Sequence, residues 1–99
     1  MKVSTLKAKA GFIQSLSIAN FISKGNSYIK VINNRKYRFK FNSISIRFER
    51  YSNISKQWIR IGSVYYCDLN FNLDTFTWDG FRNYNEKSLD ISPYIGNWG

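Results

Sequence analysis

Apolar and polar residues alternate through the middle of the chain, and the alternation changes parity at turn-forming residues. Apolar side chains occupy odd positions in 37–41 and even positions in 44–48. A single strand keeps one parity, because its side chains alternate with a period of two. The change predicts a two-residue hairpin loop at Asn42-Ser43, since Asn tolerates the positive φ of tight turns. This register pairs Arg38 with Arg47 on the polar face of the hairpin.

The same register separates core positions from surface positions. Phe39 and Ile46 pair on the apolar face, so an aspartate at either position should prevent folding by burying an unpaired charge. Arg38→Asp and Lys40→Asp, on the polar face, are expected to leave the protein folded.

A second hairpin follows from the same parity test. A three-residue loop at 33–35 pairs Ile29 with Phe39 on the apolar face. The neighbouring residues Lys30 and Arg38 then lie side by side on the polar face, because directly opposed residues share a face.

A third hairpin is predicted around a turn centred on Ile54-Ser55. Its register pairs Glu49 with Arg60. It also pairs Tyr51 with Trp58 in a cross-strand aromatic contact on the polar face.

The following apolar run is too long for one ordinary strand. Apolar residues recur at odd positions from Ile59 to Leu73, whereas strands commonly have about 5–6 residues. Gly62-Ser63 is the expected bend or bulge. A last change of parity at Asp74-Thr75 predicts a hairpin that pairs Phe71 with Trp78.

The two ends of the chain have weaker patterns. Phe12, Leu16 and Ala19 have helical spacing, but residues 16–22 also alternate, and the β-rich surroundings favour a strand. Residues 80–99 have no sustained period. They are expected to be irregular and to pack back on the body, with Trp98 among the packing residues.

Together these segments predict an all-β fold, mainly an antiparallel β-meander over about 27–79, within a single domain of residues 1–99. A small closed or partly open barrel is the expected architecture, because closure hides sheet edges. A two-layer β-sandwich is the alternative.

Charge is distributed unevenly along the 99-residue chain, whose formal net charge is +9. Residues 1–66 carry thirteen Lys and Arg side chains and one acid, Glu49, whereas residues 67–99 carry two basic and five acidic ones. Such asymmetry favours an anionic partner such as nucleic acid. The abundance of Asn, Lys and Ile is also typical of AT-rich coding sequences, as in a phage, an organelle or a low-GC bacterium.

The residue types exclude several kinds of active site. The sequence has no histidine and one cysteine, Cys67, which removes His-dependent nucleophiles, His-containing metal sites and any disulfide within the chain. Cys67 shares the odd apolar positions and is expected to be buried. Asp68, Asp74 and Asp79 are the remaining candidates for Mg²⁺ chemistry, but the last two stand where turns favour aspartate. We therefore expect no enzymatic activity, cofactor or metal.

Membrane insertion is not expected either. The uncharged stretch at 10–23 is shorter than the roughly 20 apolar residues of a membrane-spanning helix. It also lacks a clear signal-peptide cleavage site. With one cysteine and no signal, a cytoplasmic location is expected.

The polar face of the predicted sheet gathers cations and aromatic rings. The candidate binding residues are Lys30, Arg38, Lys40, Arg47, Arg60, Tyr28, Tyr51 and Trp58, with Tyr66 as a further candidate. Cations that neutralise phosphates and rings on which bases stack are what a sheet-surface single-strand binder needs.

The sequence therefore predicts a small, basic, non-enzymatic protein that binds nucleic acid without sequence specificity, single-stranded or within a ribonucleoprotein. One alternative is a phage or mobile-element module that binds an acidic protein surface or inhibits a host nucleoprotein. Another is an oligomeric structural subunit.

Overall fold

The computed structural model describes residues 3–84 and 89–96. Its elements, in chain order, are α1 (Val3–Ile18), β1 (Ile22–Lys24), β2 (Ser27–Ile32), β3 (Arg35–Phe41), β4 (Ser45–Ser52), β5 (Gln57–Tyr65), the 3-10 helix η1 (Tyr66–Asp68), β6 (Asn70–Asn72), β7 (Thr77–Asp79), β8 (Arg82–Asn83) and α2 (Ser92–Ile95). Six strands form one antiparallel sheet in the order β1-β2-β3-β4-β5-β8, and β6 pairs with β7 in a separate hairpin. The predicted antiparallel meander is confirmed.

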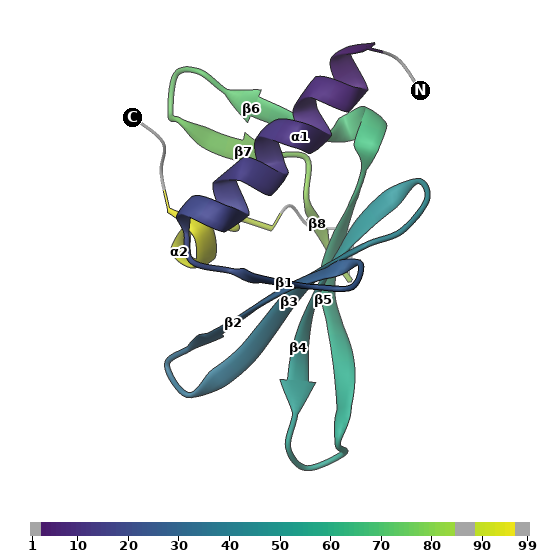
Figure 1. The fold of residues 1–99 in the computed structure, drawn as a ribbon, viewed down its shortest axis with the longest axis vertical. Helices are drawn as coiled ribbons and strands as arrows, with labels where there is room; N and C mark the ends of the chain where they lie inside the picture. Colours follow the sequence, from purple (N-terminus) through teal and green to yellow (C-terminus); the bar gives the residue numbers. More distant parts are fainter. Residues whose placement is uncertain (1–2, 85–88, 97–99) are drawn as a thin grey trace.

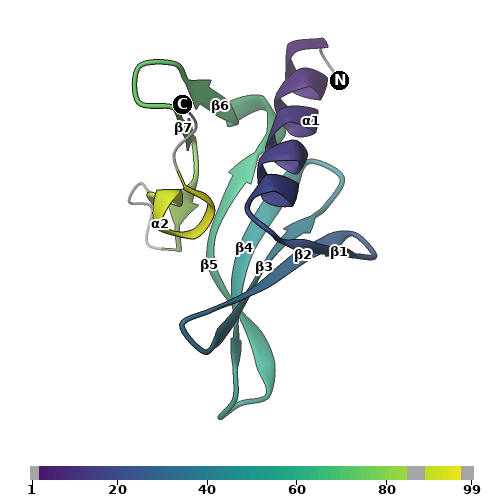
Figure 2. The ribbon, with the colours of Figure 1, turned by 60° about the vertical axis from the view of Figure 1, so that its left-hand side comes forward.

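Within the described residues the sheet does not close, so the closed form of the expected barrel is wrong. β1 and β8 lie at the two edges of an open sheet, and α1 lies with the β6–β7 hairpin on one side of it (Figure 1). The β4–β5 hairpin extends away from this covered part (Figure 2). A helix and a short hairpin, rather than a second large sheet, supply the layer that buries the sheet's apolar face.

The N-terminal segment forms a helix, so the strand expected at 16–22 is wrong. Phe12 and Leu16 are fully buried, and their spacing of four residues places them on one side of α1. This shared face packs against the sheet, which decides between the two patterns that the sequence contains. Strand pairing starts only at β1, beyond the helix.

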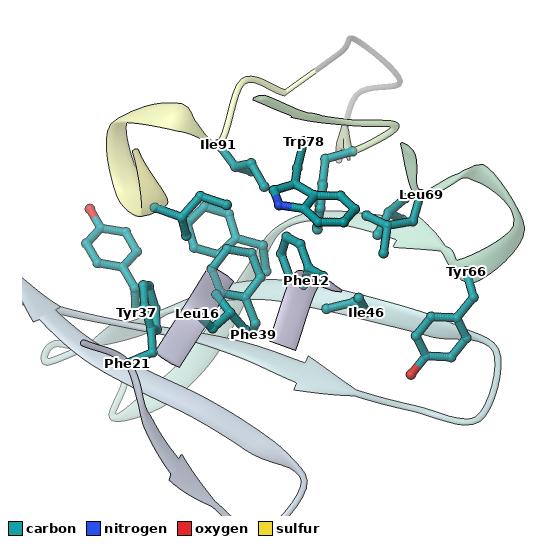
Figure 3. Packing of buried hydrophobic residues seen from close by; sticks show 14 residues of the cluster. Phe12, Leu16, Phe21, Tyr37, Phe39, Ile46, Tyr66, Leu69, Trp78 and Ile91 are labelled. Atoms are coloured by element: carbon teal, nitrogen blue, oxygen red, sulfur yellow. The ribbon is translucent and has the colours of Figure 1, made fainter. Parts of the chain in front are cut away.

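The core is built around the ring of Phe12. Its centroid lies 5.3 Å from that of Phe39 and 5.4 Å from that of Trp78 (Figure 3). It lies 5.5 Å from that of Phe81. The first two contacts are edge-to-face, a favoured arrangement of aromatic pairs. Phe12 thus joins α1 to the sheet, to the β6–β7 hairpin and to the segment that follows it.

The C-terminal residues that are described also pack on the apolar face of the sheet. Ile91 and Ile95 are buried, and the Tyr94 ring lies 5.1 Å from that of Tyr37. The prediction that Trp98 packs on the body falls outside the described residues.

A buried hydrogen bond fixes α1 to the β6–β7 hairpin. Trp78 Nε1 donates to Ser15 Oγ at 2.7 Å, and Ser15 Oγ donates to Gly11 O at 3.0 Å. The indole lies so close to α1 that a Cβ atom at Gly11 would be 3.3 Å from the ring. Ser15, on the buried side of α1, therefore provides a hydrogen-bond acceptor for the indole N–H of Trp78.

Ser15→Ala should lower the free energy of unfolding by about 1–3 kcal/mol, because the buried indole N–H loses its acceptor. Urea unfolding followed by tryptophan fluorescence measures this change. Ser17→Ala is the matched control, because Ser17 Oγ bonds to Ile13 O on the exposed side of α1, and it should change stability by less than about 0.5 kcal/mol. Equal effects of the two variants would contradict the role given to Ser15.

β3 and β4 pair with a register that differs by two residues from the expected one, because the turn is centred one residue further along the chain, where Asn42 N–H donates to Ser45 O at 2.8 Å. Phe39 pairs with Phe48, and Arg38 pairs with Glu49 rather than with Arg47. A shift by two residues keeps every side chain on its face. The predicted faces of this hairpin are therefore confirmed, although the cross-strand partners are not.

β2 and β3 are joined by a two-residue loop at 33–34, so the expected three-residue loop is wrong. Both loop residues have positive φ, 52° and 64°, as type I′ hairpin turns require. Lys30 consequently pairs with Tyr37, and Tyr28 pairs with Phe39. A slip of one residue moves every side chain of β2 to the other face of the sheet.

The predicted β4–β5 register is confirmed in the outer part of the hairpin, where Tyr51 pairs with Trp58. Further from the turn, the register shifts between Phe48 and Glu49, and this shift leaves Ile61 as an extra residue in β5. The bulge therefore adjoins the glycine at which the sequence predicts a bend or bulge.

This bulge reverses the parity in the rest of β5, where Val64 is buried and Tyr65 is exposed. In η1, which follows, Cys67, expected to be buried, is exposed, whereas Tyr66, a candidate for the polar face, is buried. The Tyr66 hydroxyl donates to Asn42 O at 2.6 Å, and burial raises its pKa. Beyond η1, Phe71 pairs with Trp78 as predicted.

Candidate nucleic-acid interface

The basic face is the face of the six-stranded sheet that is turned away from α1. A row of directly paired residues crosses it from edge to edge: Lys24 with Ser27, Ser27 with Lys40, Lys40 with Arg47, Arg47 with Ser63, and Ser63 with Arg82. Directly paired residues point to the same face of a sheet. Four cations therefore stand in one line, which we call the cationic row: Lys24, Lys40, Arg47 and Arg82.

The centre of the cationic row holds uncompensated positive charge. Lys40 and Arg47 face each other on neighbouring strands, which lie about 4.8 Å apart in a sheet. Like charges in this position destabilise the pairing. In the part of the chain that the structure describes, no carboxylate lies within ion-pair distance of either side chain. An anionic ligand would relieve this repulsion.

Arg82, at one end of the row, has a different setting. It lines a hollow of about 860 Å³ together with Asp68, Asp79 and Asp90. Hydrogen bonds from the backbone N–H and the side chain of Ser92 lower the pKa of Asp90. The positive potential of the cationic row is therefore weakest at its Arg82 end.

Beside the cationic row, Arg38 forms the one ion pair found among the described residues. Arg38 Nε donates to Glu49 Oε1 at 2.7 Å, and the Glu49 side chain is only 8% exposed. The Arg38 guanidinium also lies over Trp58, with Cζ 4.2 Å from the ring centroid. This cation is compensated and stacked, so it positions Trp58 more than it offers charge to a phosphate.

The aromatic side chains of the basic face have cationic neighbours. Lys36 Nζ lies 5.9 Å from the ring centroid of Tyr51 and 6.0 Å from that of Trp58. Arg60 Cζ lies 4.9 Å from the ring centroid of Tyr84. Tyr51 and Trp58 are half-buried and meet edge to face, 5.4 Å apart. A base that stacks on Trp58 therefore has to use the ring surface that these contacts leave open.

A groove of about 340 Å³ lies on the basic face. Its lining includes Trp58 and four cations: Lys24, Lys36, Arg38 and Lys40. A concave surface lined in this way suits an anionic ligand that also carries an apolar or aromatic part.

The basic face brings together six of the nine predicted candidates: Arg38, Lys40, Arg47, Arg60, Tyr51 and Trp58. Tyr66, the further candidate, is buried in the core. Lys30 and Tyr28 were predicted to join them, and this is wrong, because the slip in β2 turns both to the opposite face. Lys30 Nζ donates to Ala19 O at 2.7 Å, just beyond α1, where a cation satisfies the last carbonyls of a helix. Tyr28 packs on Phe41, with ring centroids 5.5 Å apart.

Three cations of the basic face are not among the predicted residues: Lys24, Lys36 and Arg82. Lys36 stands two positions before Arg38 in β3, so the alternation alone identifies it. Lys24 and Arg82 come from the short edge strands β1 and β8, which contain too few residues to show an alternation.

Comparisons of the chain with protein-family models, with curated proteins and with solved structures give no match. Among the residues that the structure describes, no group of three or more His, Cys, Asp or Glu side chains is arranged to hold a metal ion. No helix in this part of the chain is long and apolar enough to cross a membrane. The case for a function rests on the basic face.

Proposed function

We propose that this protein binds single-stranded nucleic acid, free or within a ribonucleoprotein, through the basic face, and that it is not an enzyme. The cationic row carries the proposal, because Lys40 and Arg47 stand side by side with no described carboxylate within ion-pair distance of them. Cations that neutralise phosphates release the counterions condensed on the nucleic acid, and this release drives binding. Phosphate contacts carry no sequence information, so the binding is not sequence-specific.

The aromatic part of the face supports a single strand over a duplex. Tyr51 and Trp58 adjoin the cations of the groove, and aromatic rings stack on bases that are unpaired and accessible. In a duplex the bases stack on one another, so only the backbone would reach this face.

A salt titration of the affinity for a short single-stranded oligonucleotide tests the proposal. Log affinity should fall linearly with log salt concentration, with a slope of about −0.7 for each phosphate neutralised. Three engaged cations give a slope of about −2, and Lys40→Ala combined with Arg47→Ala should make it shallower by about 1.4. Tryptophan fluorescence reports the binding.

The matched control removes the same charge away from the basic face. Lys7→Ala with Arg35→Ala changes an exposed lysine of α1 and an exposed arginine of β3 that pairs with Ile32 on the opposite face of the sheet, and it should leave the slope unchanged. An equal change in both double variants would contradict a role for the cationic row. Wild-type affinity no tighter than millimolar at physiological salt, for single and double strands, would overturn the proposal. The face would then be tested against acidic proteins.

A further inference from the structure

An apolar hollow adjoins the groove of the basic face, near the β1 edge of the sheet. Its volume is about 400 Å³, and its apolar lining consists of Ile22, Ile29 and Val31. We call these three side chains the apolar shelf. Ile22 is 73% exposed and Val31 is 63% exposed, so the shelf is open to solvent. Adjacent exposed apolar side chains of this kind mark interaction sites more often than single ones do.

The shelf and the cationic groove are one continuous surface. Lys24, Ile29 and Lys36 line both hollows. Ile22 pairs directly with Ile29, so this pair lies in the row next to the one that contains Lys24. A ligand that lies along the cationic row therefore passes beside the shelf.

The charged residues around the shelf are all basic, so they favour an anionic ligand. The charged residues that line the hollow are Lys24, Lys30 and Lys36, and no acidic residue lines it. Lys30 is already bound to Ala19 O, which leaves the other two at the boundary with the groove. The surface thus fits a ligand with an apolar, flat part attached to anionic groups.

We propose that the apolar shelf binds unstacked bases of the same single strand whose phosphates lie along the cationic row. This inference rests on the proposed function and adds a base-binding site to it. Trp58 is partly covered by the Arg38 guanidinium, whereas the exposed fractions of Ile22 and Val31 show that the shelf is open. The shelf is therefore the freer of the two surfaces for a base, and apolar side chains hold extruded bases by contact with their flat faces.

The affinities for two oligonucleotides of equal length test the shelf. One strand consists of thymidines, and the other has abasic sites throughout. Both present the same phosphates, so any difference in affinity measures contacts with bases. The wild-type protein should bind the thymidine strand at least about fivefold more tightly, the lower end of what contact with one base contributes. Ile22→Thr with Val31→Thr should reduce this ratio and leave the affinity for the abasic strand unchanged. Threonine keeps the β-branched shape that strands favour.

Ile54→Thr is the matched control, because Ile54 is 98% exposed in the β4–β5 turn and lies away from the shelf. It should leave both affinities unchanged, and circular dichroism should show that all variants are folded. A shelf variant that keeps the full ratio would overturn the shelf while the proposed function stands. A wild-type protein that binds both strands equally would overturn the shelf and also the stacking of bases on Trp58, and would leave only phosphate binding by the cationic row. Binding of neither strand would overturn both.

Discussion

Phe39→Asp is expected to leave the protein unfolded. The Phe39 side chain is fully buried, and its ring centroid lies 4.5 Å from that of Phe48 and 5.3 Å from that of Phe12. Loss of a buried phenylalanine side chain alone costs about 3–5 kcal/mol, and an unpaired carboxylate in the same place adds to this. The total is comparable with the roughly 5–15 kcal/mol that stabilises a typical domain. Far-UV circular dichroism and thermal unfolding measure the result.

Lys40→Asp, at the next residue in the chain, is the matched control. Lys40 lies on the basic face and pairs with Arg47. Aspartate replaces a contact between like charges with one between opposite charges, so the melting temperature should stay the same or rise slightly. A folded Phe39→Asp or an unfolded Lys40→Asp would contradict the faces assigned to β3.

The alternation predicts faces more reliably than it predicts partners. At the β3–β4 loop the prediction is two residues out, yet Phe39 and Arg38 lie on the faces expected of them. At the β2–β3 loop it is one residue out, which reverses β2 and removes Lys30 and Tyr28 from the predicted face. The period of two makes the second error far more damaging than the first. The dipeptide Asn33-Asn34 is the local signal that favours the shorter loop.

A bulge and the 3-10 helix after it account for the wrong burial predicted near the end of β5. The odd apolar positions continue in the sequence from Ile59 to Leu73, but the extra residue Ile61 exchanges the faces in the rest of β5, where Val64 is buried and Tyr65 is exposed. Tyr66, which is buried, and Cys67, which is exposed, then follow in η1, where the strand alternation has ended. The sequence indicates a bulge near here through a glycine, but the pattern does not say which neighbour is the extra residue.

The helix and the ends of the cationic row depend on contacts that a local pattern cannot contain. Ser15 is buried in contact with Trp78, 63 residues later, which donates a hydrogen bond to it. Lys24 and Arg82 join one row only because β1 and β8 lie at opposite edges of the same sheet. The centre of the site, on β3, β4 and β5, follows from periodicity, whereas its ends follow from the way the chain packs.

Glu49→Ala should lower the free energy of unfolding by about 3 kcal/mol, the lower end of the effect of breaking a buried ion pair. The loss of stability should be at the lower end of this range, because the Arg38 side chain is 18% exposed and part of its charge is solvated. Arg38→Asp, which the alternation alone predicts to be tolerated, should be more destabilising, because it places two carboxylates together in a site where Glu49 is 8% exposed. Urea unfolding of each variant measures these changes.

The control replaces both partners of the ion pair. Arg38→Met with Glu49→Leu leaves no buried charge, so its stability should return close to that of the wild type. A double variant no more stable than Glu49→Ala would contradict the assignment of the loss to an unpaired Arg38. Because Lys24, Lys40 and Arg47 remain, the double variant should also keep the wild-type salt slope for single-stranded oligonucleotides. Wild-type stability with an unchanged slope would separate what the ion pair contributes to the fold from what the cationic row contributes to binding.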